Sequence, residues 1–424
     1  MALSWKPSRA AIIAVGSELL TPDRVDTNSL WLTGQLNELG VAVVHKSIVG
    51  DNRVALTAAV RYAMQQGELV ITTGGLGPTE DDITRETVAS VLGLPLREEP
   101  QVITSIRSRF KSRGIEMPDI NLRQALVPRG AVALANAHGT APGLWIDHGA
   151  VVLLLLPGPP RELKPMFNTM VSTRVVDLAG SQRIFRRVLV ITGRTESAVD
   201  EAAQPIYLQW RSTNLPIENT VLAVPGQIEL HVSTRAPDSD TAGERLDQAI
   251  SVLGSVFGDD VVSVDGRRLE EVVGDMLRER GRRVSVAESC TGGLITSRLT
   301  DVAGSSAYIH ASWIVYSNEA KIDLLGIDRS LVTTHGAVSA RVAEAMAVAA
   351  QTRAGVEYGV GVTGIAGPGG GTPEKSVGTV YVALASPEEV RSKQLKLSGD
   401  RAQVKWQASQ AALDLMRRSL LEVR

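Results

Sequence analysis

Residues 287–293 (AESCTGG) hold a glutamate, a serine, the only cysteine of the chain and a threonine on a turn that ends in two glycines. A short apolar strand is predicted before this turn, and a helix over residues 294–302 after it. A hydroxyl at such a strand-to-helix turn lies beside free backbone N–H groups, as in a nucleophile elbow. The same N–H groups suit a phosphate. An ordinary turn of small residues explains the segment equally well.

Two neighbouring residues of this turn are candidate nucleophiles. Cys290 is the default on chemistry alone, because a thiol ionises more easily than a hydroxyl, although a lone cysteine packed in such a turn is commonly inert. Ser289 needs a base, and a nearby tyrosine or lysine can serve without histidine. Tyr316 and Thr363 follow two further predicted strands, and Lys321 lies one helical turn beyond Tyr316. These groups could hydrolyse an amide, and the residues alone leave the choice of nucleophile open.

A second glycine-rich segment, residues 74–82 (GGLGPTEDD), combines three glycines with three carboxylates. Glycines let a backbone approach a phosphate closely, and carboxylates hold divalent cations. Glu18, Asp26 and Asp51 come from neighbouring strand ends and could complete such a site. The alternative is that residues 79–82 cap the following helix. Capping explains one carboxylate but not three beside the glycines, so we favour a binding site.

Strands and helices alternate around both segments. In the first part we expect strands at 10–15, 41–44, 69–72 and 151–156, and helices at 29–39, with Asn28 as N-cap, 53–66, 82–92 and 101–113. Continuous apolar strands that alternate with helices predict a parallel sheet covered on both faces. Ligands of such sheets bind beyond the carboxyl ends of the strands. The glycine-rich turns all fall at that end, so they could converge on one crevice.

Polar stretches near residues 172–182 and 258–267 predict three α/β or α+β domains, with limits 1–175, 176–260 and 261–424. The middle one has a β-α-β-β-α order and no cluster of polar residues on glycine-rich turns, which favours a structural or dimerisation role. We expect its elements at 185–191, 196–210, 221–224, 227–234 and 241–257. In the last domain we expect helices at 269–280, 294–302, 339–354 and 400–421, and strands at 283–287, 313–316, 358–363 and 379–384.

The composition excludes several classes of protein. A chain of 424 residues with 44% hydrophobic content can build two or three cores. A net charge of −2 and an aromatic content of 4% predict no direct binding of nucleic acid and no membrane partner. The single cysteine, the lack of a signal-peptide pattern and the short apolar runs predict a soluble cytoplasmic protein. No zinc spacing, Walker A motif or GxGxxG motif is present.

Several motifs carry a resemblance to a known family: IIAVGSELL, VDTNSLWL, TTGGLGPTEDDIT and LLPGPPREL, and later AESCTGGL, AGSSAY, VYSNEAK, HGAVS, VTGIAGPGGG, VGTVY and GDR. Along nearly its whole length the chain resembles the CinA family of competence/damage-inducible proteins. The resemblance implies an N-terminal domain with the molybdopterin-binding fold, a KH-like linker and a C-terminal nicotinamide mononucleotide (NMN) deamidase domain. Two segments depart from the family pattern: Lys-Ser-Val at 375–377 replaces Lys-Pro-Val, and TPDR at 21–24 replaces a glycine-rich turn.

The resemblance also implies activities. The C-terminal domain would convert NMN to nicotinate mononucleotide and ammonia without a cofactor. The N-terminal domain would cleave ADP-ribose to AMP and ribose 5-phosphate with a divalent metal ion (Mg, Mn or Co). Both substrates are small nucleotides, and the family implies a homodimer. Two alternatives remain: the N-terminal domain only binds a nucleotide or a pterin as a regulatory module, or the protein is a competence or recombination accessory factor.

Site residues follow from the matching motifs. Ser289 would be the nucleophile, and Tyr316, Lys321 and Thr363 would activate it or assist proton transfer. Asp81 and Asp82 would hold the metal, with Asp26 nearby. The residues expected to bind substrate are Thr291, Gly292, Gly293, Ser306, Asn318, Gly364, Gly367 and Arg401 in the C-terminal domain and Asp26, Gly74, Gly75, Gly77 and Pro78 in the N-terminal domain.

Overall fold

The computed structural model describes residues 8–171, 174–175, 182–212 and 217–422. The chain divides into two compact units, one formed by Met1–Phe185 with Thr234–Glu244 and the other by Arg186–Ser233 with Arg245–Arg424. The predicted boundary at 172–182 falls mostly outside the described residues. Among the described helices, none combines the length and the apolar character needed to cross a bilayer.

A six-stranded sheet with the order β2-β1-β3-β8-β7-β6 forms the centre of the first unit. Its strands are β1 (Arg9–Val15), β2 (Ala42–Val49), β3 (Leu69–Thr73), β6 (Val132–Leu134), β7 (Gly143–His148) and β8 (Val151–Leu156). The strands β2, β1, β3 and β8 run parallel, which confirms the predicted parallel sheet for these four. Two strands that the sequence did not predict extend the sheet at one edge. Strand β7 pairs antiparallel with β8, and β6 pairs antiparallel with β7.

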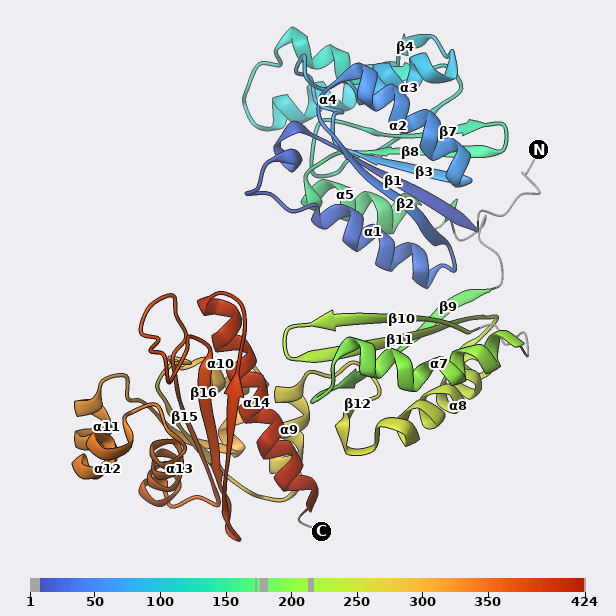
Figure 1. Ribbon diagram of the computed structural model, residues 1–424. Helices are drawn as coiled ribbons and strands as arrows, with labels where there is room; N and C mark the ends of the chain where they lie inside the picture. Colours follow the sequence, from blue (N-terminus) through green and yellow to red (C-terminus); the bar gives the residue numbers. More distant parts are fainter. Residues whose placement is uncertain (1–7, 172–173, 176–181, 213–216, 423–424) are drawn as a thin grey trace. The chain divides into compact units, whose positions relative to one another are not determined.

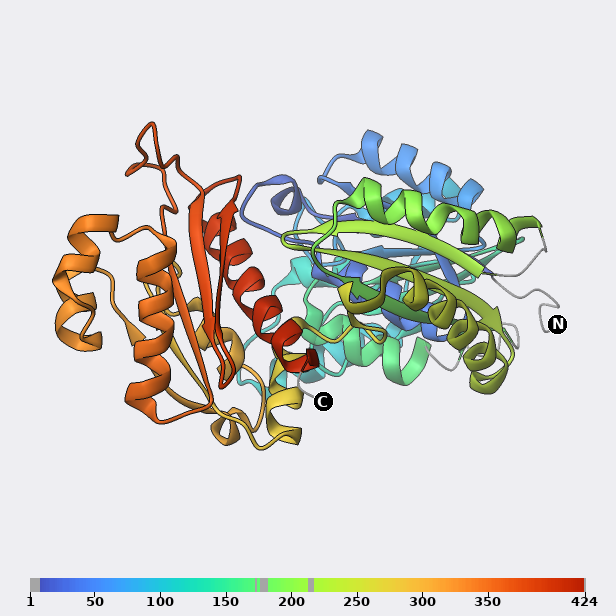
Figure 2. The ribbon, with the colours of Figure 1, turned by 60° about the horizontal axis from the view of Figure 1, so that its bottom comes forward.

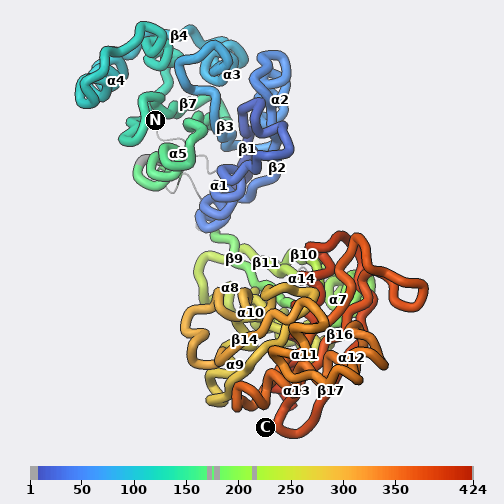
Figure 3. Tube along the Cα trace, turned by 90° about the vertical axis from the view of Figure 1, so that its left-hand side faces the viewer, coloured from blue at the N-terminus to red at the C-terminus, as the bar shows by residue number. Residues whose placement is uncertain are grey.

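Helices cover both faces of this sheet. The helices α1 (Thr27–Glu38) and α5 (Pro160–Met166) pack on one face, and α2 (Arg53–Gln66) and α3 (Thr84–Leu92) on the other (Figures 1 and 3). Strand β1 shows why its apolar run is continuous: Ala10 and Ile12 enter one core, whereas Ala11, Ile13 and Val15 enter the other. Both sides of the strand are therefore buried.

Shorter elements complete the first unit. They are α4 (Pro100–Ser112), the strand pair β4 (Leu96–Glu98) and β5 (Leu126–Pro128), the 3-10 helices Ser17–Leu20 and Asp119–Ala125, and the π-helix Phe167–Val171.

The predicted N-cap of the first helix, α1, is wrong. Its N-cap is Asp26, whose carboxylate accepts a hydrogen bond of 2.9 Å from the Ser29 N–H. Asn28 instead donates its amide to the Gly158 carbonyl at 2.7 Å.

A four-stranded sheet with the order β10-β11-β9-β12 forms the middle part of the chain. Its elements are β9 (Arg183–Ile191), α7 (Glu196–Ser212), β10 (Ile217–Val224), β11 (Gln227–Ala236), α8 (Ser239–Phe257), the 3-10 helix Gly258–Asp260 and β12 (Val261–Ser263). The predicted β-α-β-β-α order is confirmed, and β12 adds one strand. Alternate residues of β11 are buried, because α7 and α8 pack against one face of the sheet (Figures 1 and 2).

The C-terminal part contains a five-stranded sheet with the order β14-β13-β15-β16-β17. Its strands are β13 (Val284–Glu288), β14 (Ile309–Ile314), β15 (Tyr358–Gly364), β16 (Thr379–Ala385) and β17 (Val390–Lys396). The strands β13, β14 and β15 run parallel to one another. Strand β16 pairs antiparallel with β15, and β17 pairs antiparallel with β16. A 3-10 helix, Ser305–Ala307, precedes β14.

Two groups of helices cover this second sheet. On one face lie α9 (Leu269–Glu279), α10 (Leu294–Thr300) and α14 (Arg401–Glu422), which share the largest core with the strands. On the other lie α11 (Asn318–Leu325), α12 (Arg329–His335) and α13 (Ala340–Ala354) (Figure 1). Leu269–Glu279 and Ala340–Ala354 agree closely with the predicted helices, whereas α11, α12 and β17 were not predicted.

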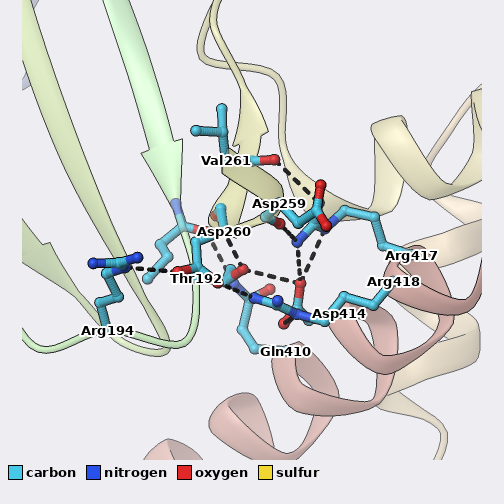
Figure 4. Close-up of polar contacts among 10 residues, drawn as sticks. Thr192, Arg194, Asp259, Asp260, Val261, Gln410, Asp414, Arg417 and Arg418 are labelled. Carbon is cyan, nitrogen blue, oxygen red and sulfur yellow. Dashed lines mark hydrogen bonds and ion pairs between the residues drawn. The ribbon is translucent and has the colours of Figure 1, made fainter. Parts of the chain in front are cut away.

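A polar network joins the middle sheet to α14 within the second unit (Figure 4). The Asp414 carboxylate accepts hydrogen bonds from Arg417, Arg418 and the Thr192 hydroxyl. Arg418 also donates to Asp260 at 2.8 Å, and the buried Arg417 donates to the carbonyl of Val261 at 3.0 Å. Buried charges are stable only when paired and hydrogen-bonded, as they are here.

Candidate functional site

The glycine-rich turns of the first unit meet in one crevice, as expected from the sequence. A cavity of about 370 Å³ lies beyond the carboxyl ends of β1, β2, β3 and β8, where parallel sheets bind ligands. Its lining includes Val15, Gly16, Glu18, Asp51, Gly74, Gly75, Gly77, Pro78, Asp81, Asp82, Pro157, Gly158 and Glu162. The predicted residues Gly74, Gly75, Gly77, Pro78, Asp81 and Asp82 are thus together. Asp26 is not among the lining residues, because it caps α1.

Two of the glycines in the crevice have no room for a side chain. Gly74 has a φ of +97°, and a Cβ atom there would lie 2.2 Å from the Val15 carbonyl oxygen. A Cβ atom on Gly77 would lie 2.3 Å from the carboxylate of Asp82. A side chain at position 74 would push apart the ends of β1 and β3, and one at position 77 would displace the carboxylate of Asp82.

Asp82 fixes the turn rather than the helix that follows. Its Oδ2 atom accepts hydrogen bonds from the backbone N–H of Thr79 at 3.0 Å and from the Thr79 hydroxyl at 2.5 Å. Helix α3 begins two residues later, and its N-cap Ile83 makes no side-chain capping bond. The helix-capping alternative is therefore wrong. Arg123 holds the same turn from the other side, since its guanidinium donates to the Thr79 carbonyl at 2.8 Å.

The carboxylates of the crevice suit a cation only in part. Asp51 accepts a hydrogen bond of 2.8 Å from the Ser17 N–H and so ties two strand ends together. Within the described residues, no group of three acidic, histidine or cysteine side chains is arranged to hold a metal ion. Magnesium in nucleotide sites is commonly held by one or two carboxylates, with phosphate oxygens and water as the other ligands. The exposed Asp81 and the neighbouring Asp82 fit that pattern.

The sequence analysis did not name the polar lining residues Gln124, Thr140 and Glu162 as site residues. Gln124 is almost fully buried, and its side-chain carbonyl accepts a hydrogen bond of 3.1 Å from Asn121. Glu162 is buried and accepts one of 2.8 Å from Asn136. The motif LLPGPPREL contains Glu162 and was the available signal, whereas nothing near Gln124 marked it as a site residue.

The turn after β13 is organised by Glu288, a role the sequence analysis did not assign. This carboxylate is fully buried and accepts hydrogen bonds from the N–H groups of Gly293, Ile295 and Thr296 at 3.0, 3.2 and 2.9 Å. The Thr296 hydroxyl donates to it as well, at 2.8 Å. Glu288 therefore satisfies the free N–H groups at the start of α10 and fixes the turn that carries Ser289.

Ser289 and Lys321 form the central pair of the second site. The Nζ atom of Lys321 lies 3.1 Å from the Oγ atom of Ser289 and also contacts the carbonyl oxygens of Val315, Tyr316 and Ser317. Both side chains are buried, with 6% of Ser289 and 1% of Lys321 exposed. Burial lowers the pKa of Lys321, because the charged form loses its hydration. A neutral amine in hydrogen-bond contact with a serine can accept the hydroxyl proton.

Cys290 lies beside this pair but has the opposite environment. Its side chain is 5% exposed and packs into the main core of the C-terminal part. Burial raises the pKa of Cys290 to about 12, so its thiol stays protonated at neutral pH. The thiol is therefore buried and protonated, whereas the Ser289 hydroxyl contacts an amine.

The expected partners Tyr316 and Thr363 have other contacts. Tyr316 is 61% exposed, and its hydroxyl oxygen accepts a hydrogen bond of 2.8 Å from Arg401. The backbone carbonyl of Tyr316, and not its hydroxyl, accepts a hydrogen bond from Lys321. The buried Thr363 hydroxyl donates to the Ala337 carbonyl at 2.8 Å. Tyr316 lies two residues after β14, whereas Thr363 lies within β15 and not after it, as the sequence had indicated. Both strands are next to β13, so the two backbones border the site while the hydroxyls are engaged elsewhere.

Arg401 and Lys405 lie one turn apart at the start of α14, on the same side of the helix. Arg401 bridges the Tyr316 hydroxyl and the Gly367 carbonyl, the latter at 2.8 Å. The Nζ atom of Lys405 would lie 3.6 Å from a Cβ atom on Gly292, so this lysine, which sequence reasoning missed, borders the Ser289 turn. The two cations could together hold a phosphate.

The remaining predicted residues differ in their surroundings. Thr291 is fully buried, and its hydroxyl has no hydrogen-bond partner among the described residues. Gly293 is the N-cap of α10, and Gly364 ends β15. Ser306 and Asn318 are exposed, and within the described chain no recorded contact links either to Ser289.

These folds and sites define a mixed α/β protein with a molybdopterin-binding-like domain followed by a second α/β domain. Residues 11–176 match the family described as "Probable molybdopterin binding domain", and residues 266–420 match the one described as "CinA C-terminal domain". A CinA-like protein of Koribacter versatilis is 44% identical over 416 residues, which cover 97% of this chain and 100% of that protein. One of Acidobacterium capsulatum has the same identity and coverage. The chain belongs to the CinA family.

Solved structures resemble parts of the chain. The competence/damage inducible protein CihA of Agrobacterium tumefaciens is 37% identical, with a TM-score of 0.35, and the match covers 37% of this chain and 98% of that one. The protein CinA of Thermoplasma acidophilum is 32% identical, with a TM-score of 0.37, over 39% of this chain and 97% of that one.

Proposed function

We propose that the C-terminal domain is an amidohydrolase that converts NMN and water to nicotinate mononucleotide and ammonia. The observation that carries this proposal is the contact of 3.1 Å between the Lys321 amine and the Ser289 hydroxyl. The burial of both groups supports it, because desolvation favours the neutral amine that a base must be. The family resemblance supplies the substrate.

The reaction proceeds in two halves. Lys321 takes the proton of Ser289 while the Oγ atom attacks the amide carbon, which forms a tetrahedral oxyanion. The proton then passes from Lys321 to the leaving amine, and ammonia departs from the acyl-enzyme. In the second half, water transfers a proton to Lys321 and attacks the acyl carbon. The bond between this carbon and the Oγ atom of Ser289 then breaks, Oγ takes the proton back from Lys321, and the acid product leaves as its carboxylate after losing a proton to water. Glu288 keeps the turn in place throughout.

The nucleotide phosphate is bound by Arg401 and Lys405 in this proposal. An anion between them would gain two charge-assisted contacts at the start of a helix. On the basis of the family resemblance we also propose a set of further substrate-binding residues. They are Thr291, Gly292, Gly293, Ser306, Asn318, Gly364 and Gly367. A homodimer is proposed on the same basis, and light scattering of the full chain measures it.

We propose further that the N-terminal domain hydrolyses ADP-ribose to AMP and ribose 5-phosphate. The glycine-rich crevice, with Asp81 and Asp82 on one turn, supports a diphosphate ligand accompanied by a divalent cation such as Mg²⁺, Mn²⁺ or Co²⁺. When bound, the cation would neutralise diphosphate charge. Asp81 and Asp82 would hold it, and the backbone of Gly74–Pro78 would contact the phosphates.

Two assays on the purified full chain test these proposals. Ammonia release is followed with NMN, and AMP release with ADP-ribose and a divalent cation. Ser289→Ala should abolish ammonia release, while Cys290→Ala should retain it, because the thiol is a packing group. Full activity of Ser289→Ala would refute the nucleophile. If the chelator EDTA leaves AMP release unchanged, the metal-dependent mechanism is wrong, and if no AMP is formed at all, the N-terminal domain is a binding module.

A further inference from the structure

The turn between β10 and β11 of the middle sheet packs directly on α14. The Trp406 indole N–H of this helix donates to the Pro225 carbonyl of the turn at 3.0 Å. One helical turn further on, the Gln410 amide donates to the side-chain carbonyl of Gln227 at 2.9 Å. Gly226 has a φ of +83°, and a Cβ atom there would lie 2.8 Å from the Cγ atom of Gln410. The turn and the helix therefore leave no room for a side chain between them.

Buried polar groups extend this contact to α10, the helix that follows the turn after β13. Arg298 of α10 is 4% exposed, and its guanidinium lies over the Trp406 ring, with 4.2 Å between Cζ and the ring centre. It also donates to the Ser409 hydroxyl at 2.6 Å and to the side-chain carbonyl of Gln410. The Glu270 carboxylate of α9 pairs with it at 2.7 Å. This buried cation fixes α9, α10 and α14 to one another, because the loss of any partner would leave part of its charge unpaired.

The first turns of α14 carry the two cations proposed to hold the substrate phosphate. Lys405 directly precedes Trp406, and Arg401 lies one helical turn earlier. Arg401 has anchors of its own, the Tyr316 hydroxyl and the Gly367 carbonyl. In the described chain, Lys405 forms no side-chain hydrogen bond or ion pair, so its position is set by the backbone of the helix. The contacts that hold this part of α14 thus decide where the Lys405 ammonium lies.

We propose that the β10–β11 turn of the middle domain is a positioning element of the deamidase site, which holds the first half of α14 so that Lys405 meets the phosphate of NMN. The inference rests on the amidohydrolase function proposed above. It gives the middle domain a role in substrate binding as well as a structural one. A shift of α14 would lengthen the contact between the ammonium and the phosphate, and such charge-assisted bonds are strong only near about 2.7–2.9 Å.

The test compares two ligands that differ only in the phosphate: nicotinate mononucleotide, the proposed product, and nicotinate riboside. Calorimetric titration into the full chain measures the affinity for each. Gly226→Ala puts a methyl group against Gln410, and Trp406→Phe removes the bond to Pro225 while it keeps a ring beneath Arg298. Each variant should weaken binding of the mononucleotide about tenfold, equivalent to roughly 1.4 kcal/mol, and leave the affinity for the riboside unchanged.

Gly281→Ala is the matched control for the turn. Gly281 lies in the same unit and also has a positive φ, +59°, but a Cβ atom there would meet nothing within 4 Å. Gly281→Ala thus introduces similar backbone strain without a contact to α14 and should leave both affinities unchanged. A second comparison uses Lys405→Met. Adding Gly226→Ala to it should weaken mononucleotide binding no further, because the turn acts through this lysine.

Equal weakening of both ligands, or unchanged binding of the mononucleotide in Gly226→Ala, would overturn the proposal, since a merely structural turn cannot distinguish a phosphate. The same holds if the unaltered chain binds no nicotinate mononucleotide. Ammonia release from NMN tests the function separately. If the affinities change as expected but no ammonia is released, the amidohydrolase proposal fails and the positioning role stands. If ammonia is released while Gly226→Ala leaves mononucleotide binding unchanged, the function stands and the positioning role is wrong.

Discussion

The Nζ atom of Lys321 lies 3.1 Å from the Oγ atom of Ser289, and both side chains are buried. Lys321 comes from α11 and Ser289 from the turn after β13, so the contact exists only in the folded chain. The neighbouring Cys290 makes no side-chain hydrogen bond to a base in the described chain, and burial raises the pKa of its thiol to about 12. Position in the fold, rather than intrinsic acidity, therefore separates the two nucleophile candidates.

The first prediction concerns pH. Burial lowers the pKa of Lys321 from the ordinary value of 10.5, so the neutral amine becomes available at a lower pH than for a free lysine. Ammonia release should rise with pH through that lowered pKa, because the protonated amine cannot accept the serine proton. Lys321→Met should reduce kcat by about 10²–10⁴-fold and remove this alkaline rise. A rise that persists in Lys321→Met would assign it to another group.

The second prediction concerns Glu288. In the folded protein, three backbone N–H groups donate to the two carboxylate oxygens of Glu288. The amide of Glu288→Gln has only one acceptor oxygen for these three donors. We expect a loss of about 2 kcal/mol in the free energy of unfolding, measured with urea, and a lower kcat for ammonia release. Glu374→Gln is the control, since Glu374 is exposed. Equal stability of both variants would contradict the role assigned to Glu288.

The third prediction concerns the acidic turn. Asp82→Asn removes a charge that faces the crevice and weakens the contacts with Thr79. AMP release should be lost, while ammonia release continues, because the two sites belong to different domains. The neighbouring Glu80 is exposed and does not line the crevice, so Glu80→Gln should retain both activities. If Glu80→Gln fails and Asp82→Asn does not, the cation site has been placed on the wrong carboxylate.

The fourth prediction concerns the network on α14 (Figure 4). Asp414→Ala leaves the guanidinium of Arg417, 2% exposed, without its only anionic partner in the described chain. We expect a loss of about 3 kcal/mol in the stability of the second unit, measured by chemical denaturation. Thr192→Val removes one hydrogen bond to the same carboxylate but no charge, and its effect should be smaller. A larger effect of Thr192→Val would show that the charge is not what matters.

Much of the fold was predictable because its signals are local. The strand Val151–Leu156 and the helix Arg53–Gln66 have the predicted limits, since a continuous apolar run and a helical repeat ended by Gly67 identify them directly. The short strands β4, β5, β6 and β12 were missed, because three residues carry no periodicity and become strands only by pairing. The polar edge strand β17 was missed for the same reason, since it exists through its bonds to β16.

The sequence by itself determined where chemistry could occur. The glycine-rich turns at strand ends predicted the crevice of the first unit and the turn of Ser289, because parallel strands bring their carboxyl ends to one edge. The tertiary structure decided the surroundings of each candidate atom. It buries Cys290 and raises its pKa, places the Lys321 amine on Ser289, and directs the Tyr316 hydroxyl to Arg401. Desolvation and hydrogen bonding depend on neighbours distant in the chain, and these are defined only when the sheet is assembled.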